Sequence, residues 1–189
     1  SAISPYLGPL SGATMVTLTG SGFVDTNDNL KVFIGSAGSG TATRVSSTEI
    51  KCDPLPGGQD NEENTDVQVW VMLNGQQKSV ASVSYYYYEE PVVAAALPNL
   101  GPLRGEQEVT VSVTTTDGII PQTKYLSNDF DSLVKCRFGD RKTTLTALYV
   151  DDRSIKCRTP TGASAGAINA ELTLNGQQYS SSTTQYTYY

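Results

Sequence analysis

Four consecutive tyrosines, Tyr85 to Tyr88, are the residues of this sequence with the clearest capacity for molecular recognition, and they stand in the stretch "SVSYYYYEEP". Exposed aromatic rings can stack on a sugar ring or pack against a neighbouring protein. The same run could instead be an ordinary strand that carries aromatic side chains on both faces. The local sequence does not decide between a binding surface and a structural strand.

Residues suited to catalysis are scarce. The 189 residues include no histidine, which removes the commonest general base, the commonest zinc ligand and the usual partner of a Ser or Cys nucleophile. Carboxylates remain, but they fall in predicted loops and nothing in the sequence brings them together. We therefore expect no catalytic residues, no metal site, no cofactor and no enzyme activity.

The charge and composition narrow the possible partners. With 13 basic and 19 acidic residues the net charge is −6, and no basic cluster is present to neutralise phosphates. No stretch of 18 apolar residues could cross a bilayer. We expect neither a nucleic-acid partner nor contact of this segment with a membrane, and the prevalence of β-branched and hydroxylated residues favours β structure.

An internal repeat defines the domains. The segment "PYLGPLSGATMVTLTG" from Pro5 matches "PNLGPLRGEQEVTVSV" from Pro98, "STEIKC" matches "DRSIKC", and "LNGQQ" occurs twice. The sequence thus predicts two homologous domains at 1–90 and 95–189, joined by a short linker at 91–94 that makes a semi-rigid string. Because the chain starts and stops where repeats do, we expect a segment of a longer array; arbitrary boundaries are the alternative.

Each copy has the pattern of an antiparallel sandwich. Short apolar and polar alternations are separated by Gly, Pro, Asn and Asp. In "MVTLTG", Val16 and Leu18 point one way and the threonines the other, and Val109 and Val111 repeat this in the second copy. The Asn-Gly of "LNGQQ" predicts a hairpin turn in each copy.

Comparison of the copies separates inward from outward aromatic residues. In "VQVWVML" the valines match apolar residues of the second copy, whereas Trp70 matches Glu171, so Trp70 is expected to face outward. Tyr85 and Tyr87 match tyrosines and are expected in the core. Tyr86 and Tyr88 then face outward beside Trp70.

These three aromatic residues could form a platform for contacts between copies or with attached glycans. The alternative is an apolar sheet face covered by the linker or by a loop.

The whole pattern resembles an IPT/TIG domain, the immunoglobulin-like fold of plexin and Met-type receptor ectodomains. The resemblance rests on the Pro-x-x-Gly-Pro opening, "KVFIG", the Cys before a Pro-Gly turn and the closing aromatic strand, and it covers both copies. It implies an all-β chain of two tandem early-set sandwiches of about seven strands each. The second copy departs from the family pattern near 114–132, where about eleven residues are inserted. The family also has DNA-binding members, which the acidic charge disfavours here.

The resemblance also implies a disulfide between Cys136 and Cys157, which would stabilise the second domain by about 3 kcal/mol. In the first copy the position of Cys136 is held by Val32, so Cys52 has no partner within its domain. Cys52 is either a buried thiol that behaves as a small hydrophobe or part of a bridge between chains. A disulfide favours an extracellular or cell-surface location.

Two acidic loops, "DTNDN" and "SNDFDS", occupy matching places, with Asp25 opposite Asp129 and Asn27 opposite Asp131. They suggest calcium binding, but the first lacks the glycine and the bidentate glutamate of an EF-hand loop, and Asx turns explain both. The acidic run at 60–66 is expected to be a solvated loop.

Hydroxyl residues form the last candidate set. The chain has no Asn-x-Ser/Thr sequon, but its Ser/Thr clusters could carry O-linked sugars, the alternative being a plain hydrophilic β surface. The candidates are Ser46, Ser47, Thr48, Thr114, Thr115, Thr116, Thr143, Thr144, Ser180, Ser181, Ser182, Thr183 and Thr184.

Taken together, the sequence predicts a non-enzymatic extracellular structural or adhesion repeat, part of a longer IPT/TIG array or cell-surface fibre. Its expected partners are neighbouring copies in the same chain or fibre, and glycans. The alternative function is a ligand- or carbohydrate-binding module of a receptor ectodomain or secreted hydrolase.

Overall fold

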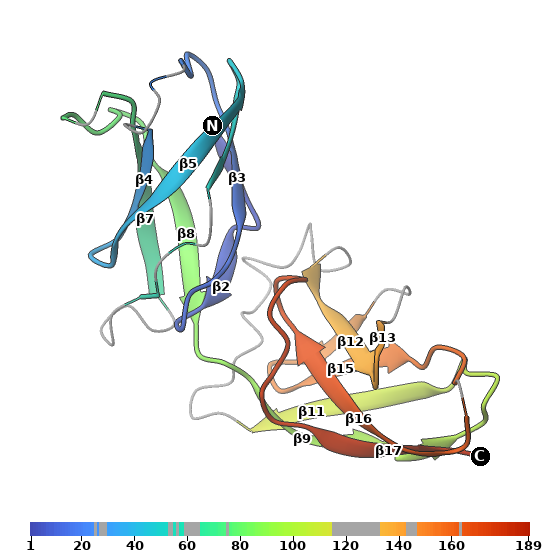
Figure 1. The fold of residues 1–189 in the computed structure, drawn as a ribbon. Helices are drawn as coiled ribbons and strands as arrows, with labels where there is room; N and C mark the ends of the chain where they lie inside the picture. Colours follow the sequence, from blue (N-terminus) through green and yellow to red (C-terminus); the bar gives the residue numbers. More distant parts are fainter. Residues whose placement is uncertain are drawn as a thin grey trace. The chain divides into compact units, whose positions relative to one another are not determined.

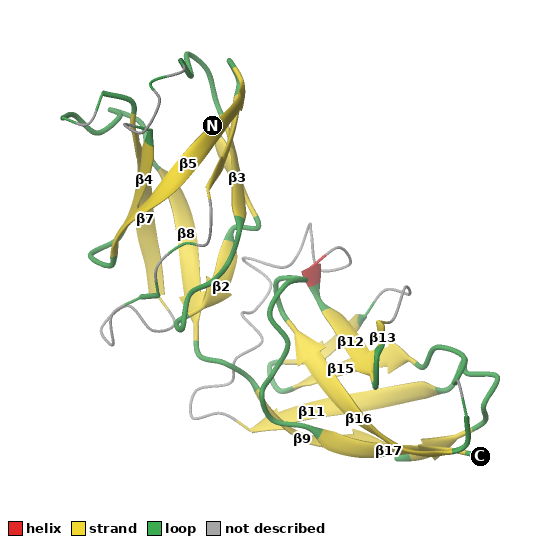
Figure 2. Ribbon diagram, viewed as in Figure 1, coloured by secondary structure: helices red, strands yellow, loops and turns green. Residues whose placement is uncertain are grey.

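The computed structural model describes every residue except 25, 27–29, 53–54, 56, 59–64, 75, 115–132, 143–146 and 163. The chain divides into two compact units, Ser1–Glu89 and Glu90–Tyr189, and each is built from strands (Figures 1 and 2). Among the described residues no helix has the length and hydrophobicity needed to cross a membrane.

The first unit is a sandwich whose two layers share a strand. In order along the chain its strands are β1 (Ala2–Ser4), β2 (Leu7–Pro9), β3 (Val16–Thr19), β4 (Lys31–Ile34), β5 (Gly38–Ser46), β6 (Glu49–Cys52), β7 (Thr65–Met72) and β8 (Val83–Tyr88). The hydrogen-bonded order is β1-β3-β6-β5-β4-β7-β8-β2. The first half of β5 pairs with β4 and its second half with β6, so β5 belongs to both layers.

The chain also changes layer between β1 and β2. Strand β1 pairs antiparallel with β3 in one layer, and β2 pairs parallel with β8 in the other. The crossing occurs at Pro5, whose peptide bond with Ser4 is cis, and the second unit has a cis Leu97–Pro98 bond at the matching place.

The second unit has the same arrangement of strands in two layers, but its layers are two separate sheets. Its strands are β9 (Val92–Leu97), β10 (Leu100–Gly101), β11 (Glu108–Thr114), β12 (Lys135–Phe138), β13 (Arg141–Lys142), β14 (Leu148–Asp151), β15 (Ser154–Arg158), β16 (Gly166–Thr173) and β17 (Thr184–Tyr188). One sheet has the order β10-β17-β16-β12-β13 and the other β14-β15-β11-β9. Strands β13 and β14 together occupy the place of β5.

The segment 91–94, expected to be a linker, mostly belongs to the second unit. Val92 and Val93 pair with Thr114 and Val113 of β11, so they are strand residues rather than a connection. The sequence reasoning was wrong here because the first copy begins at Ser1 and offers no residues to align with them. Residues 89–91 are what separates β8 from β9.

The core of each unit follows the predicted alternation. Val16 and Leu18 are buried in the first unit and Val109 and Val111 in the second. Two tyrosines of the closing strand pack edge to face in each core, Tyr85 with Tyr87 at 5.3 Å between ring centroids and Tyr186 with Tyr188 at 5.1 Å. The prediction of an all-β chain with two immunoglobulin-like sandwiches is confirmed.

Candidate functional site

Trp70 lies half-buried on the outer face of the layer that contains β7. Its neighbour there is Phe33, which the sequence analysis did not predict. Strands β4 and β7 pair so that Phe33 is directly opposite Trp70. The ammonium group of Lys78 lies over both rings, 4.6 Å from the centroid of Trp70 and 4.8 Å from that of Phe33. These three residues, the lysine–aromatic cluster, are held by cation–π attraction, which favours a cation over each ring face.

The hairpin after β7 carries Lys78 to this position. The Asn74 carboxamide oxygen accepts hydrogen bonds from the backbone N–H of Gln76 and of Gln77, both at 3.0 Å. Lys78 then pairs with Met72 in an isolated β-bridge. The Asx turn of "LNGQQ" therefore returns the chain alongside β7 and places the lysine above the rings.

Ser79 fixes the far side of the same hairpin. Its hydroxyl accepts a hydrogen bond from the backbone N–H of Val71 at 3.1 Å and donates one to the carbonyl of Ala81 at 2.6 Å. The second unit repeats the arrangement, because Ser180 Oγ accepts from Leu172 N–H at 3.2 Å and donates to Ser182 O at 2.9 Å. Each hairpin thus has the same internal support.

The second unit has a different cluster at the matching place. Arg137 on β12 occupies the position of Phe33, Glu171 that of Trp70 and Tyr179 that of Lys78. The Arg137 guanidinium lies 4.2 Å from the centroid of the Tyr179 ring and is ion-paired with Glu171. In the first unit the strands carry the rings and the hairpin carries the cation, whereas in the second unit a strand carries the cation and the hairpin carries the ring. The Glu171 carboxylate balances the Arg137 charge, so the second cluster has no net charge.

The pKa values in the second cluster follow from these contacts. The hydrogen bond to the Glu171 carboxylate raises the pKa of Arg137 above its usual value. Burial raises the pKa of Tyr179, against the opposing effect of the Arg137 charge. Both groups keep their ordinary protonation states at neutral pH, so the ion pair and the stacked ring persist there.

Tyr86 shares a sheet face with Trp70 but does not adjoin it. Tyr86 is opposite Asp66, and Trp70 stands four positions beyond Asp66 on β7, a distance of about 13 Å along a strand. Between them Gln68 accepts a hydrogen bond from Ser82 at 2.6 Å and donates one to Ser84 at 3.3 Å. A polar row therefore divides the aromatic surface.

Tyr88 is buried, with 1% of its surface exposed, so the expectation of an exposed Tyr88 was wrong. Strand alternation predicts the side on which a residue lies, but not what packs over that side. Tyr88 is paired with Pro9 of β2, and its carbonyl accepts a hydrogen bond from Leu10 at 2.8 Å. Its match in the second copy, Tyr189, is 67% exposed.

The cysteines occupy equivalent core positions. Cys136 on β12 and Cys157 on β15 form a disulfide with an S–S distance of 2.01 Å, the pair that the family resemblance implied, and it joins the two sheets of the second unit. In the first unit the same places are taken by Val32 and Cys52, both fully buried. A bridge from Cys52 to another chain would require the core to open.

The hydroxyl candidates divide by exposure. Ser47, Thr48, Thr114, Ser181 and Thr183 are exposed, and Ser46, Ser182 and Thr184 are half-buried. Ser180 is 3% exposed and its hydroxyl is bonded within the hairpin, so it was wrongly included among the candidates. Thr115, Thr116, Thr143 and Thr144 lie outside the described residues.

The acidic loops are mostly outside the described part of the chain. Asp25, Asn27, Asp129 and Asp131 are not described, and neither is the run 59–64; Asp66 is half-buried on β7. Within the described residues no group of three or more His, Cys, Asp or Glu side chains could hold a metal ion.

Sequence reasoning missed Phe33 and Lys78. Their proximity to Trp70 depends on the register of β4 against β7 and on the path of the hairpin. One signal was present in the sequence: where Trp70 becomes Glu171, Phe33 becomes Arg137 and Lys78 becomes Tyr179. All three positions differ between the two copies, as is expected where residues in contact change together.

Comparisons with known proteins agree with this architecture. The chain is similar to two structures of the plexin A4 extracellular region, each at 18% identity. The structure of domains 1 to 8 matches with a TM-score of 0.57, over 98% of this chain and 18% of the plexin chain. The structure of domains 1 to 10 matches with a TM-score of 0.58, over 100% of this chain and 16% of the plexin chain. FdeC, an Escherichia coli adhesin, matches at 14% identity and a TM-score of 0.36, over 100% of this chain and 63% of that chain.

The chain spans less than a fifth of the length of the plexin chains that it matches. The family model for the IPT/TIG domain matches twice, at residues 1–87 and 91–188, so that each unit is matched almost completely. The chain belongs to the IPT/TIG domain family, with one domain in each unit.

Proposed function

We propose that this chain is a non-enzymatic extracellular segment that acts as a structural or adhesive element, in series with further domains of its family. The observation that carries the proposal is the direct succession of two copies of one sandwich, with three residues, 89–91, between the last strand of the first unit and the first strand of the second. Such serial arrangement suits a protein whose function depends on repeated domains.

Two further observations support an extracellular location. The disulfide between Cys136 and Cys157 is of a kind that persists in oxidising compartments. The extracellular region of plexin A4 has a similar fold. The exposed hydroxyls of Ser47, Thr48, Thr114, Ser181 and Thr183 are the proposed attachment points for O-linked sugars.

Electron microscopy of the native particle tests the array. Negative-stain images should show sandwich-sized densities repeated along one chain or fibre. Isolated compact particles would contradict the proposal. Intact mass of the native material tests glycosylation separately, since a peptide-only mass would exclude attached sugars and leave the array unaffected.

The lysine–aromatic cluster is the proposed contact surface for neighbouring domains. Trp70 is half-buried, and the Lys78 ammonium lies 4.6 Å from the centroid of its ring, so a sugar that stacked on this face of the ring would have to displace Lys78. This arrangement gives less support to the carbohydrate-binding alternative than an open ring would.

Substitution separates the two functions. Trp70→Ser should weaken assembly between chains. The control is Glu171→Ser, which makes a substitution at the matching place on the equivalent sheet face of the second unit. If Trp70→Ser leaves assembly unchanged but abolishes binding on a glycan array, the ligand-binding function replaces the one proposed. If both assembly and glycan binding are unchanged, the cluster is not a contact surface.

A further inference from the structure

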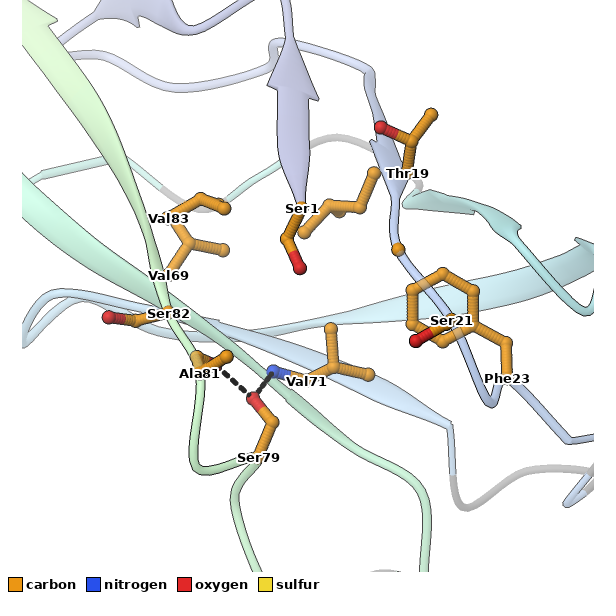
Figure 3. Close-up of a pocket in the computed structure, with 12 residues that line it drawn as sticks. Ser1, Thr19, Ser21, Phe23, Val69, Val71, Ser79, Ala81, Ser82 and Val83 are labelled. Atoms are coloured by element: carbon orange, nitrogen blue, oxygen red, sulfur yellow. Dashed lines mark hydrogen bonds between the residues drawn. The ribbon is translucent and has the colours of Figure 1, made fainter.

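The lysine–aromatic cluster is part of a wider basic and apolar surface on the first unit. Val71 of β7 lines a pocket between the two layers (Figure 3), so Trp70 and Met72 on either side of it in the strand face outward. Met72 is opposite Lys31 of β4 on one side and Lys78 of the hairpin on the other. Two lysines therefore flank Met72, in the row of the sheet next to the rings of the cluster.

This surface, the basic–aromatic face, consists of Lys31, Phe33, Trp70, Met72 and Lys78. Both lysines are exposed. The ion pairs between described side chains lie in the second unit, so neither lysine has a carboxylate partner in the described part of the first unit. The whole chain has a net charge of −6, and a positive face on it therefore attracts the acidic surface of another copy.

The second unit carries a surface that is apolar and acidic. Strand β14 is the edge strand of its sheet, and Leu148 and Val150 are 55% and 45% exposed on it. The turn into β15 adds the carboxylates of Asp151, which is exposed, and Asp152, which is half-buried. Asp151 accepts a hydrogen bond from the backbone N–H of Arg153 at 2.9 Å, which holds the turn. Two carboxylates and one guanidinium give this turn a net charge of −1.

Each of the two surfaces occurs in one unit only. Where the second unit has Asp151 and Asp152, the first has Ser46 and Ser47 and so lacks these carboxylates. Where the first unit has the lysine–aromatic cluster, the second has a cluster whose cation is paired with Glu171. Charge complementarity therefore favours contact between the first unit of one copy and the second unit of another over contact between like units.

We propose that the basic–aromatic face binds the acidic edge, Leu148 and Val150 to Asp152, of a second copy of this chain. In this contact the two lysines lie against the carboxylates, and the exposed aliphatic side chains pack on the rings and on Met72. Every chain carries both surfaces, so the contact can repeat from copy to copy, as unlike surfaces do in rings and fibres. It rests on the proposed function, since it names the partner of the contact surface assigned there.

Sedimentation velocity of the full chain at about 10 mM ionic strength tests this contact, because charges then act over about 30 Å. The chain should associate reversibly, and salt should weaken the association. The emission of Trp70, the single tryptophan, should shift to shorter wavelength as the partner covers its ring.

Charge reversal on the basic–aromatic face should weaken the association. Lys78→Glu and Lys31→Glu should each weaken it about tenfold. Lys31→Glu leaves the hairpin and its contacts with the rings intact, so its effect cannot come from a disturbed cluster. The matched control is Lys51→Glu, which makes the same change at an exposed position on β6 in the other layer and should leave the association nearly unchanged.

A mixture of two variants identifies the partner surface. Lys31→Glu/Lys78→Glu loses the basic–aromatic face and Asp151→Lys/Asp152→Lys loses the acidic edge. Neither should associate alone, but an equal mixture should, because each chain keeps one intact surface. The proposal is overturned if the mixture stays monomeric or if the unsubstituted chain does not associate.

The same variants separate this partner from the proposed function. If Trp70→Ser weakens assembly while Asp151→Lys/Asp152→Lys leaves it unchanged, the cluster is a contact surface for a different partner. The proposed function then stands, and the acidic edge is excluded.

Discussion

At the scale of single residues, a glycine faces a buried tyrosine hydroxyl in each unit. A Cβ atom added to Gly8 would overlap the hydroxyl oxygen of Tyr85, and one added to Gly101 would overlap that of Tyr186. Both glycines belong to the Gly-Pro dipeptide near the start of each repeat. The glycine of this dipeptide is therefore explained by the packing of the closing strand, since only a residue without a side chain leaves room for the phenol.

Gly8→Ala should destabilise the first unit by about 1 to 3 kcal/mol, because the new methyl group overpacks the core. Adding Tyr85→Phe should restore part of that loss. Restoration is incomplete because the methyl would also meet the side chain of Thr14. Urea unfolding followed by Trp70 fluorescence measures both effects, and Gly101→Ala, which acts in the other unit, should leave this transition unchanged. Full stability in Gly8→Ala would contradict the packing argument.

The stability of the first unit should fall with alkaline pH partly through Tyr85. Burial raises the pKa of this phenol far above its ordinary value of 10.0, and a hydrogen bond with Thr14 only partly opposes the shift. Since the folded pKa is the higher one, the stabilising contribution is complete below pH 10, where the unfolded phenol is neutral, and is lost as the pH rises above it.

Tyr85→Phe should therefore make the free energy of unfolding fall less steeply above pH 10. The measurement is urea unfolding at a series of alkaline pH values. If the hydrogen bond with Thr14 contributes to stability, Tyr85→Phe is less stable than the original protein at neutral pH. The quantity to compare is therefore the slope of the free energy of unfolding against pH, and not the free energy itself. Equal slopes in the two proteins would show that Tyr85 is already ionised in the folded state.

At the scale of elements, the "LNGQQ" hairpin has the same hydrogen bonds in both units. Asn175 accepts hydrogen bonds from Gln177 N–H at 3.0 Å and Gln178 N–H at 3.1 Å, as Asn74 does from Gln76 and Gln77. The same turn presents a lysine over aromatic rings in one unit and an aromatic ring under an arginine in the other. A constant hairpin thus supports two different surfaces.

Asn74→Ala should release Lys78 from the cluster. Loss of the two accepted hydrogen bonds costs about 1 to 2 kcal/mol in the hairpin. Without the Asx turn, the lysine no longer covers Trp70, and the tryptophan emission should shift to longer wavelength as its ring meets water. Asn175→Ala breaks the equivalent turn and is the control, because it should leave the emission unchanged. Unshifted emission in Asn74→Ala would mean that Lys78 keeps its place without the turn.

The sequence predicted these elements better than their contacts. Period-two alternation identified the inward residues of β3 and β11, and the repeat identified Tyr85 and Tyr87 as core residues, because both signals are local to one strand. The contact between Phe33 and Trp70 depends on the register of β4 against β7, and the two residues are 37 positions apart in the sequence. The burial of Tyr88 depends on the residues that pack beside the end of β8. Neither property is encoded in a single strand.

At the scale of the whole molecule, the two units hold similar cores together in different ways. The second unit joins its sheets through the disulfide between Cys136 and Cys157, whose cysteines are 21 residues apart. The first unit has Val32 and Cys52 at these places and joins its layers through β5, which pairs with strands of both. Each unit has a core of its own, so each should unfold in a separate transition.

Reduction of the disulfide should therefore act on the second unit alone. Opening the crosslink removes about 3 kcal/mol of stability by restoring freedom to the unfolded chain. Far-ultraviolet circular dichroism, which follows all the strands, should then show two transitions, of which the reductant shifts one to lower temperature. The transition seen by Trp70 fluorescence should stay in place, since that residue belongs to the first unit. Cys52→Ser controls for effects of the reductant on the remaining thiol. An equal shift in both signals would mean that the two units unfold as one cooperative body, because stability lost at Cys136 could reach Trp70 only through coupling between the cores.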